Sequence, residues 1–530
     1  MKKILSLLLV LVMVLAMFAG CGNNTTTPTE PSSSGETTPD AEINYANSTV
    51  ILYTGNVRGN IEVYPQIAAA KAAYEAKGAT VILADAGNYL QGAAAANSDR
   101  GLTVYNLMDA AGYDVAAMGM YEFVYGEATT GYIYHSNLTK YFTQAELYKG
   151  AEALEYRKNA PWAEEAVMGN RDAKAAASFK VVCSNLTAGA ENSGYYAFEA
   201  NTVLGETLKV GFVSAVSEDV ASFVQDGFLT GYTFGEVAAP DCDVVVSLGG
   251  GTGDIVIEAP VDGELVVGAY VIDNTTKAVT EETVDMTGSD ADVAALVAAV
   301  SPAAVVGRTT VTLNGADSVN WNGESNLGDL TADALLWYAE NKVEGLQDVP
   351  VVAIQNGGNC DNFIYTGDIT EVDLLRALPF SPMGVGIVYV TGAELLETLE
   401  AATQSENCPG WAQVAGLEYT VDTTAAYDVG EAYGDFFMAA SIKRVTITSV
   451  NGAAFDENAT YAVIGDNFLM NGNDTYYTFG AVKEAGENYV EVSTFGGLKT
   501  RDVVALYIQE VLNGTVGSDY ANTQGRITVK

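Results

Sequence analysis

Short β-branched runs alternate with longer helical stretches from Thr49 onward, which is the pattern of layered α/β folds. Strands ending in loops or turns are predicted at residues 49–56, 79–92 and 115–126, and helices at residues 61–78 and 101–114. Gly78 stands where the first helix should be capped. In such sheets, binding sites lie at the carboxyl ends of strands. The three loops after the strands are therefore the first places to look for chemistry.

The first 21 residues have the pattern of an export signal. Lys2 and Lys3 precede an apolar run from Ile4 to Phe18, interrupted only by Ser6, and small residues precede Cys21. The run is short for a spanning helix, which needs about 20 residues. The sequence "FAGC" resembles the lipobox of bacterial lipoprotein signals, in which the cysteine is acylated; secretion with a free Cys21 is the alternative. We expect an extracytoplasmic protein, lipid-anchored to the bacterial cell membrane.

Composition narrows the possible partners. The chain has 530 residues and is 48% hydrophobic, so it can bury at least two cores after a Thr/Ser/Pro-rich tether at 22–45. Its formal net charge is −42. The charge repels polyanions, which makes nucleic acid an unsuitable partner. The single histidine, His135, cannot supply a site that needs several imidazoles. Four cysteines lack the spacing of a zinc site, and the pairing of Cys360 with Cys408 stays open.

The three loops resemble those of the 5'-nucleotidase family. They read "ILYTGNVRG", "DAGNYLQG" and "GMYEFVYG", against the family's "ILHTNDxHG", "DAGDxxQG" and "GNHEFDYG". The resemblance covers nearly everything after the tether and implies an α/β and α+β fold. It places a metallophosphatase-like four-layer αββα sandwich at 46–295 and a 5'-nucleotidase-type α/β domain at 307–530. In that family the loops, with a further lone His and a "GHxH" pair, hold two bridged divalent cations.

The residues at the family's metal-ligand positions cannot serve that role. These positions hold Tyr53, Asn56, Arg58, Asn88, Met120, Tyr121 and Gly249, and the "GHxH" loop has no counterpart. Asparagine and tyrosine offer only neutral oxygen, and the arginine would repel cations. We therefore expect no catalytic residue, no metal and no cofactor. Two hypotheses remain for the pocket: a packed scaffold without ligand, or a repurposed site lined by the tyrosines and asparagines.

The C-terminal half resembles its family domain more closely, in "GESNLGDLTADALLWYAE", "VVAIQNGGNCDNFIYTGDIT" and "YAVIGDNFLMNGNDTYYTF". In the family an "NGGGIR" loop binds substrate and its Arg holds phosphate. Here residues 356–361 read "NGGNCD", so Asp361 reverses the charge, and Gly323 matches a second phosphate-binding Arg. The resemblance therefore implies that a phosphate group would be repelled where the family offers a fork of donors.

The base-binding part of the resemblance is better kept. Trp411 and Tyr476 match two aromatic residues that stack on the nucleobase, with core filling as the alternative for both. Asp474 is retained, while Asn473 and Thr475 replace two glycines and could narrow the loop. The candidate ligand-binding residues are Asn356, Gly358, Asp361, Trp411, Asp474 and Tyr476. They favour a neutral nucleoside or a similar flat molecule over a nucleotide.

Three functions follow from the sequence. The first is a surface lipoprotein with a lost metal centre that binds a nucleoside-like molecule or serves as a scaffold. The second is an active 5'-nucleotidase or related metallophosphoesterase in nucleotide catabolism. The third is a structural or adhesive surface protein. The ligand chemistry favours the first, a protein that is not an enzyme.

Overall fold

The structure is a computed structural model that describes residues 43–125, 179–189, 198–261, 263–379, 384–486, 488–494 and 496–530. The chain divides into two compact units, Met1–Asn44 and Tyr45–Lys530, and the second contains every element named below. The export signal, residues 22–42 of the tether, Cys21 and His135 lie outside the described residues. Within the described ranges, no helix combines the length and the apolar character needed to cross a bilayer.

A six-stranded sheet organises the first half, in the order β12-β11-β1-β2-β3-β4. Its strands are β1 (Ser48–Gly55), β2 (Thr80–Asp85), β3 (Val115–Ala117), β4 (Lys180–Val182), β11 (Val266–Asp273) and β12 (Val279–Glu282). The first four strands run parallel, whereas β11 is antiparallel to β1 and to β12. Strand β1 is buried along its whole length, as its continuous β-branched and apolar run predicts.

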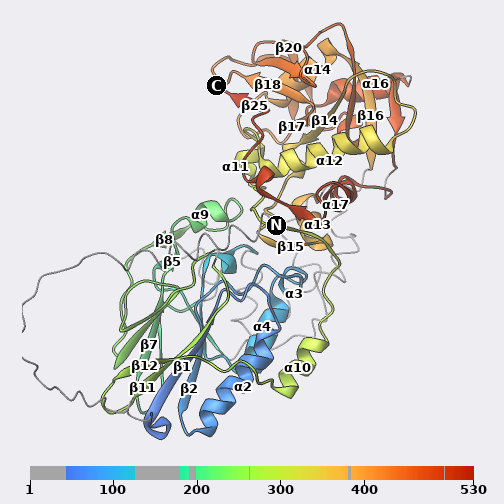
Figure 1. Cartoon of the computed structure of the whole chain (residues 1–530). Coiled ribbons are helices and arrows are strands. Elements are labelled where there is room, and N and C mark those ends of the chain that lie inside the picture. The colour runs from blue at the N-terminus through green and yellow to red at the C-terminus, as the bar shows by residue number, and fades with distance from the viewer. Residues whose placement is uncertain are drawn as a thin grey trace, which may run out of the picture. The chain divides into compact units, whose positions relative to one another are not determined.

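Helices cover one face of this sheet and a second sheet covers the other. Helices α2 (Val63–Ala76), α4 (Leu102–Ala111) and α10 (Ala291–Ala298) contact one another beside the strands (Figure 1). The second sheet has the order β10-β9-β7-β6, formed by Ile255–Ile257, Val244–Leu248, Val210–Ser214 and Thr202–Leu204. Ile51 and Tyr53, alternate residues of β1, share a core with Phe212 and Val246 of the second sheet.

The mixed α/β fold expected from the sequence is confirmed, and three of its layers are visible as helices, sheet and sheet. Between residues 179 and 264, the described residues contain one helix, α9 (Val220–Phe223), beside a small pair of strands, β5 (Leu186–Ala188) and β8 (Tyr232–Phe234). The outer helical layer of the expected sandwich is not among the described residues. Gly78 follows α2 at φ +92°, and its N–H donates to Glu75 O, which confirms the predicted cap.

The second half is built on a five-stranded sheet in the order β17-β14-β22-β16-β23, flanked by two three-stranded sheets, β15-β13-β24 and β21-β18-β25. Its strands are β13 (Val305–Thr309), β14 (Val351–Asn356), β15 (Gly367–Thr370), β16 (Val385–Thr391), β17 (Ala412–Ala415), β18 (Leu417–Val421), β19 (Asp428–Tyr433), β20 (Phe436–Ser441), β21 (Val445–Val450), β22 (Thr460–Asp466), β23 (Tyr489–Glu491), β24 (Thr515–Val516) and β25 (Ile527–Val529). Its helices are α11 (Asp317–Asn320), α12 (Asn326–Lys342), α13 (Glu371–Ala377), α14 (Gly392–Ala402), α15 (Asn467–Met470), α16 (Tyr477–Ala485) and α17 (Thr500–Glu510).

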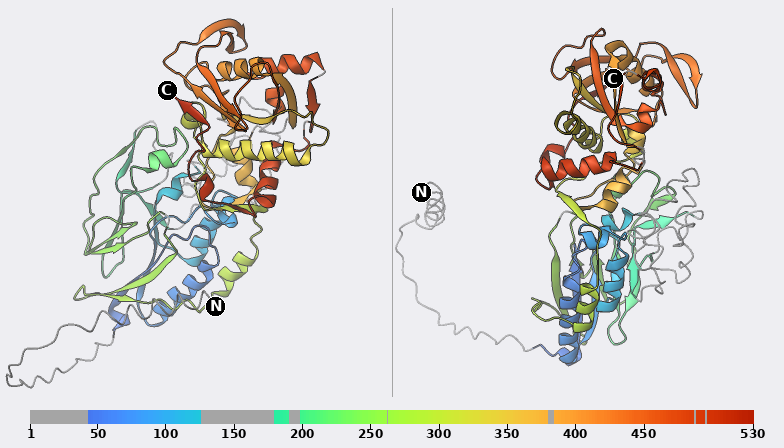
Figure 2. Two further views of the ribbon diagram at one scale, coloured as in Figure 1. Left: turned by 45° about the horizontal axis from the view of Figure 1, so that its top comes forward. Right: turned by 90° about the vertical axis from the view of Figure 1, so that its right-hand side faces the viewer.

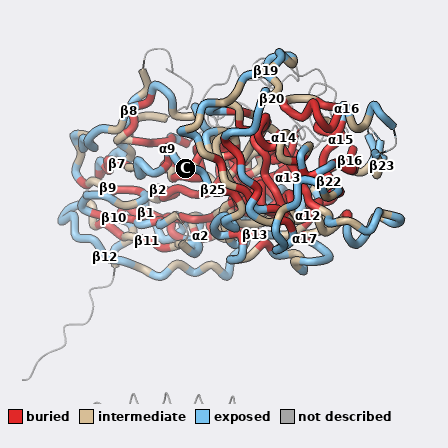
Figure 3. The backbone as a smooth tube through the Cα atoms, turned by 90° about the horizontal axis from the view of Figure 1, so that it is seen from above, coloured by how far each residue is buried: buried red, intermediate tan, exposed pale blue. Residues whose placement is uncertain are grey.

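Alternate residues of this sheet face two separate cores. Ala353 and Ile387 pack with residues of α12 and α17, whereas Ile354 and Val388 pack with residues of α14 and α16. Helix α12, yellow in Figure 2, contacts β14 and β17. Strands β16 and β22 are buried over nearly all of their length (Figure 3). These buried central strands thus fix the positions of the loops that contain the candidate site residues of this half.

Candidate functional site

The loops after β1 and β2 bring two asparagines together at the carboxyl edge of the first sheet. Asn88 Nδ2 donates to Asn56 Oδ1 at 2.9 Å and to the carbonyl of Ala259 at 3.1 Å. Asn56 Nδ2 donates to the carbonyls of Pro260 at 2.9 Å and Glu264 at 3.3 Å. Both side chains are buried, with 3% and 2% of their surface exposed. We call the two asparagines and these three carbonyls the amide ladder.

The ladder residues stand on backbone that few side chains adopt. Asn56 has φ +54° and Asn88 has φ +64°, and asparagine is one of the few non-glycine residues that tolerate this left-handed region. Arg58, at φ +49°, is a less usual occupant. Surrounding hydrogen bonds must therefore hold the first loop in place.

A buried carboxylate fixes the second loop. Glu122 accepts N–H groups from Asn88, Tyr89 and Gly119, each at 2.8 Å, and from Leu90 at 3.1 Å. Burial raises the pKa of Glu122, and these four backbone bonds oppose that rise because they stabilise the charged form. Glu122, retained from the family motif, therefore holds the loop of Asn88 in shape.

Arg58 joins the first loop to the second half of the chain. Its guanidinium lies 3.5 Å from the centroid of the Tyr121 ring. Nε donates to Gln91 O at 2.6 Å and Nη2 to Gln91 Oε1 at 2.8 Å. Nη2 also donates to Thr366 O at 2.6 Å and lies 3.1 Å from Thr366 Oγ1, which is 3.1 Å from Tyr121 OH. We call these four residues the Arg58 clamp.

The other positions matched to family ligands serve packing. Tyr53 stacks on Tyr270 of β11 with ring centroids 5.5 Å apart, and burial raises the pKa of its hydroxyl. Met120 is buried at the start of the short helix Met120–Phe123. Gly249 follows β9 at φ +79°, and a Cβ there would lie 3.0 Å from Ala86 O, beside the second loop. Across the described ranges, no three His, Cys, Asp or Glu side chains are grouped so that they could hold a metal ion.

The two aromatic residues expected to stack on a base are core residues. Trp411 is 1% exposed, Tyr476 is 0% exposed, and both belong to the core around α14 and α16. Tyr476 OH donates to Gly410 O at 2.8 Å. Thr475 packs on the same glycine, since a Cβ on Gly410 would lie 2.5 Å from Thr475 Oγ1. The burial of both rings agrees with core filling, the alternative given for these two residues.

The predicted polar partners of that site do meet. Asn356 Nδ2 donates to Asp474 Oδ2 at 2.8 Å, and Gln355 Nε2 donates to Asn356 Oδ1 at 2.8 Å. Burial raises the pKa of Asp474, and the bond from Asn356 opposes the rise. Gly358 N–H donates to Pro409 O at 2.8 Å, which ties this loop to the segment before Trp411 rather than leaving its N–H for a ligand.

Gly323 and Asp361, which the resemblance matches to phosphate-binding arginines, contact different parts of the second half. Gly323 O accepts Gln413 Nε2 at 2.7 Å, and a Cβ on Gly323 would meet only Val529, at 3.8 Å. Asp361 N–H donates to Ala377 O at 3.0 Å, at the end of α13. Cys360 and Cys408 are both buried free thiols, so the pairing left open by the sequence is not formed.

Sequence reasoning missed Thr366 and the organising role of Glu122. The signal for Glu122 was present, because it stands in the retained part of "GMYEFVYG". No signal in the sequence points to Thr366. Arg58 and Tyr121, at positions matched to ligands by the resemblance, suggest a cation–π contact but do not indicate a third residue.

Comparison with known proteins identifies the second half. The family model for the 5'-nucleotidase C-terminal domain matches residues 305–481. The trifunctional nucleotide phosphoesterase protein YfkN of Bacillus subtilis is 31% identical over 195 residues, which is 36% of this chain and 12% of YfkN. An apyrase of Tabanus yao is 26% identical over 212 residues, which is 39% of this chain and 35% of the apyrase. The chain thus spans only part of these relatives.

Among solved structures, a 5'-nucleotidase precursor from Thermus thermophilus aligns over 91% of this chain and 99% of its own, with 19% identity and a TM-score of 0.37. Residues 305–481 of this chain therefore form a 5'-nucleotidase C-terminal domain.

Proposed function

We propose that this chain is a non-hydrolytic member of its family that serves as a scaffold on the bacterial surface. The observation that carries the proposal is the amide ladder. Asn88 turns both of its N–H donors to acceptors, Asn56 Oδ1 and Ala259 O, at positions where the family has cation ligands. A cation needs lone pairs at such positions, and the amide nitrogen of Asn88, which donates to both acceptors, offers none.

The residues at these positions do not fit a pair of divalent cations. Two such ions require anionic oxygens to offset their mutual repulsion, and imidazoles where the metal is zinc or iron. The ladder supplies two neutral amides instead. Arg58 adds a positive charge beside Tyr121, one of the former ligand positions. The clamp and the ladder instead give the loops the cross-links that bridging metal ions would give.

The surface location is the second part of the proposal. An apolar run ending in "FAGC" and a Thr/Ser/Pro-rich tether support acylation at Cys21 and display outside the cytoplasm. Mass spectrometry of the mature N-terminus should find a diacylated or triacylated Cys21. An unmodified terminus or cleavage elsewhere would remove the anchor from the proposal and leave secretion.

Metal-dependent phosphoester hydrolysis is the competing function, supported by family membership. The deciding experiment measures metal content and phosphate release from nucleoside mono-, di- and triphosphates with the purified mature protein. We expect no stoichiometric zinc, manganese or iron and no release. Stoichiometric metal, together with turnover that Asn88→Ala abolishes, would establish the enzyme instead.

The variant Asn88→Asp sharpens this test. It restores the family's bridging carboxylate but places an acceptor opposite Asn56 Oδ1 and Ala259 O, so we expect the free energy of unfolding to fall by about 1–3 kcal/mol. Exposed Asn522→Asp changes the net charge equally and should have little effect. If manganese or zinc restored the stability of Asn88→Asp beyond that of the original protein, a metal site would be latent in the fold and the proposed misfit would be refuted.

A further inference from the structure

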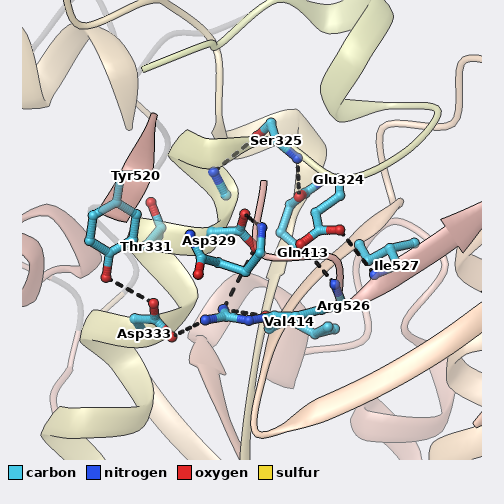
Figure 4. A network of polar contacts seen from close by, with 12 residues as sticks. Glu324, Ser325, Asp329, Thr331, Asp333, Gln413, Val414, Tyr520, Arg526 and Ile527 are labelled. Atoms are coloured by element: carbon cyan, nitrogen blue, oxygen red, sulfur yellow. Dashed lines mark hydrogen bonds and ion pairs between the residues drawn. The ribbon is translucent and has the colours of Figure 1, made fainter. Parts of the chain in front are cut away.

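Three acidic side chains and one guanidinium hold residues 520–530 against the rest of the second half (Figure 4). Glu324, just before α12, accepts the backbone N–H groups of Arg526 and Ile527, each at 3.0 Å. Asp329 Oδ2, on the first turn of α12, accepts the N–H of Gln524 at 3.0 Å. Each of these acids therefore binds backbone of the segment that leads into β25.

The third acid pairs with the side chains of the same segment. Asp333 Oδ1 accepts Arg526 Nη2 at 2.7 Å, and Asp333 Oδ2 accepts Tyr520 OH at 2.8 Å. Arg526 Nη1 donates to Val414 O at 2.9 Å. The guanidinium is thus committed to Asp333 and to a carbonyl, and it lies only 3.7 Å from Asp329 Oδ1, which is too far for a hydrogen bond.

The charges in this cluster do not balance. With Glu324, Asp329 and Asp333 all ionised, three negative charges would face the one positive charge of Arg526. The side chain of Asp329 is 1% exposed, and its Oδ1 has no hydrogen-bond partner among the described residues. Burial, followed by the negative charge of Glu324, raises the pKa of Asp329 to about 8, although Arg526 and the N–H of Gln524 oppose the rise.

The other groups around Asp329 do not remove this imbalance. Asp333 lies on the same helix, Tyr520 comes from the short helix Ser518–Tyr520, and the thiol of Cys360 lies near Asp329. Tyr419 of β18 lies near Glu324. None of them adds a positive charge, so a proton is the remaining means of neutralising the buried carboxyl group of Asp329.

We propose that the carboxyl group of Asp329 keeps one proton taken from solvent and shares it with Glu324 in a hydrogen bond, and that this proton latches residues 520–530 onto α12 and β18. With the proton in place, Asp329 donates to Glu324, and Oδ1 of Asp329 gains the hydrogen bond that it lacks. When the proton returns to solvent, two neighbouring carboxylates repel each other beneath the segment that both of them hold. Strand β25 pairs with β18 from Tyr419↔Ile527 to Val421↔Val529, so loss of the latch loosens that edge of the sheet.

The direction of the pH effect follows from proton linkage. The latched state keeps the proton to a higher pH than the released state, in which Asp329 is solvated. The released state therefore binds fewer protons, and the equilibrium constant for release rises with pH by up to about tenfold per unit until the pKa of Asp329 in the latched state is reached.

Amide hydrogen exchange tests the latch directly in the full mature chain. After correction for intrinsic exchange, protection of the Gln524, Arg526 and Ile527 amides should fall by up to about tenfold per pH unit between roughly pH 6 and 8. The amide of Ile354, in the central sheet, reports global unfolding and should retain higher protection throughout. In Asp329→Asn, whose amide can donate to Glu324 as the protonated acid does, the pH dependence should disappear.

Two matched variants complete the test. Asp333→Asn should weaken protection at every pH but keep the slope, because it removes the ion pair and leaves the shared proton. Glu324→Gln should end the slope at a lower pH, because it removes the negative charge that adds to burial in raising the pKa of Asp329, and it gives a second measurement if Asp329→Asn fails to fold. A wild-type slope of zero, an unchanged slope in the neutral variants, or exchange of the three amides only at the rate of Ile354 would each overturn the proposal.

Discussion

Two buried asparagine amides are hydrogen-bonded to each other and to backbone carbonyls at the edge of the first sheet. Each ladder amide is satisfied by carbonyl or amide oxygens, so burial carries no unpaired polar group there. In Asn88→Asp, an oxygen atom replaces Nδ2. The group that donates to Asn56 Oδ1 and Ala259 O would then become a third acceptor. The two N–H bonds of one amide group therefore set the hydrogen-bond pattern that joins the loops after β1 and β2.

Trp411 gives the sharpest residue-scale test of core filling against ligand stacking. Because its side chain is 1% exposed, we expect Trp411→Ala to lower the free energy of unfolding by about 3–5 kcal/mol. Phe437→Ala, at a residue that is 43% exposed, should cost about 0.5 kcal/mol or less. Urea denaturation measures both variants. Calorimetric titration of the original protein with adenosine should give no binding heat. Saturable binding that is lost in Trp411→Ala would contradict core filling and support a stacking site.

Asp85 makes stability depend on pH in a direction that can be worked out. It is buried, accepts Thr54 Oγ1 at 2.5 Å and Gly87 N–H at 2.7 Å, and burial raises its pKa from 3.8 to about 7 despite these bonds. The folded state therefore keeps a proton that the unfolded chain releases. This stabilisation is complete below about pH 4 and is lost as the pH rises through 7.

The variant Asp85→Asn should remove that dependence. Between about pH 4 and 7 its free energy of unfolding should fall less steeply than that of the original protein, by up to about 1.4 kcal/mol per pH unit. Asp466, whose pKa burial also raises to about 7, will keep a residual slope. The measurement is urea denaturation across the pH range, with exposed Asp519→Asn as the charge control. Equal slopes in the variant and the original protein would contradict the assignment.

At the scale of elements, the sequence predicted the strands and helix ends that depend mainly on neighbouring residues. The run "TVILYTG" is apolar and β-branched, and it became the buried strand β1; Gly78 closed α2 where predicted. The burial of Trp411 could not be predicted in the same way, because its core is built from residues far away in the sequence, such as Ile354 and Phe479. The partner of Arg58 lies 308 residues along the chain, beyond any periodicity in the sequence.

The Arg58 clamp predicts a coupling between two loops. The guanidinium of Arg58 donates hydrogen bonds to Gln91 and Thr366. Nearby, the N–H of Asp368 donates to Gly92 O at 2.7 Å. Arg58→Lys keeps the charge but loses the planar fork, so we expect a local loss of about 1–3 kcal/mol. Faster hydrogen exchange at the Asp368 amide would register it. Exposed Arg308→Lys is the control, and unchanged exchange in Arg58→Lys would mean that the clamp does not join the loops.

At the scale of the whole molecule, charge opposes compaction. The chain carries 67 acidic and 25 basic residues, for a net charge of −42. Surface ion pairs such as Lys277–Asp243, at 2.8 Å, contribute little each and cannot offset repulsion over the whole surface. Repulsion between exposed charges extends over the Debye length, about 30 Å at 10 mM salt and about 8 Å at 150 mM.

Screening should therefore stabilise this protein. We expect the urea midpoint to rise as sodium chloride increases from about 10 to 150 mM, because the compact state gains more from screening than the expanded one. Tetramethylammonium chloride at equal ionic strength should act alike, since screening depends on charge and not on ion identity. A fall of the midpoint with salt would show that specific ion pairs outweigh net repulsion. A far larger effect of a divalent cation at matched ionic strength would instead reveal a bound ion, and would reopen the question of a metal site that the amide ladder argues against.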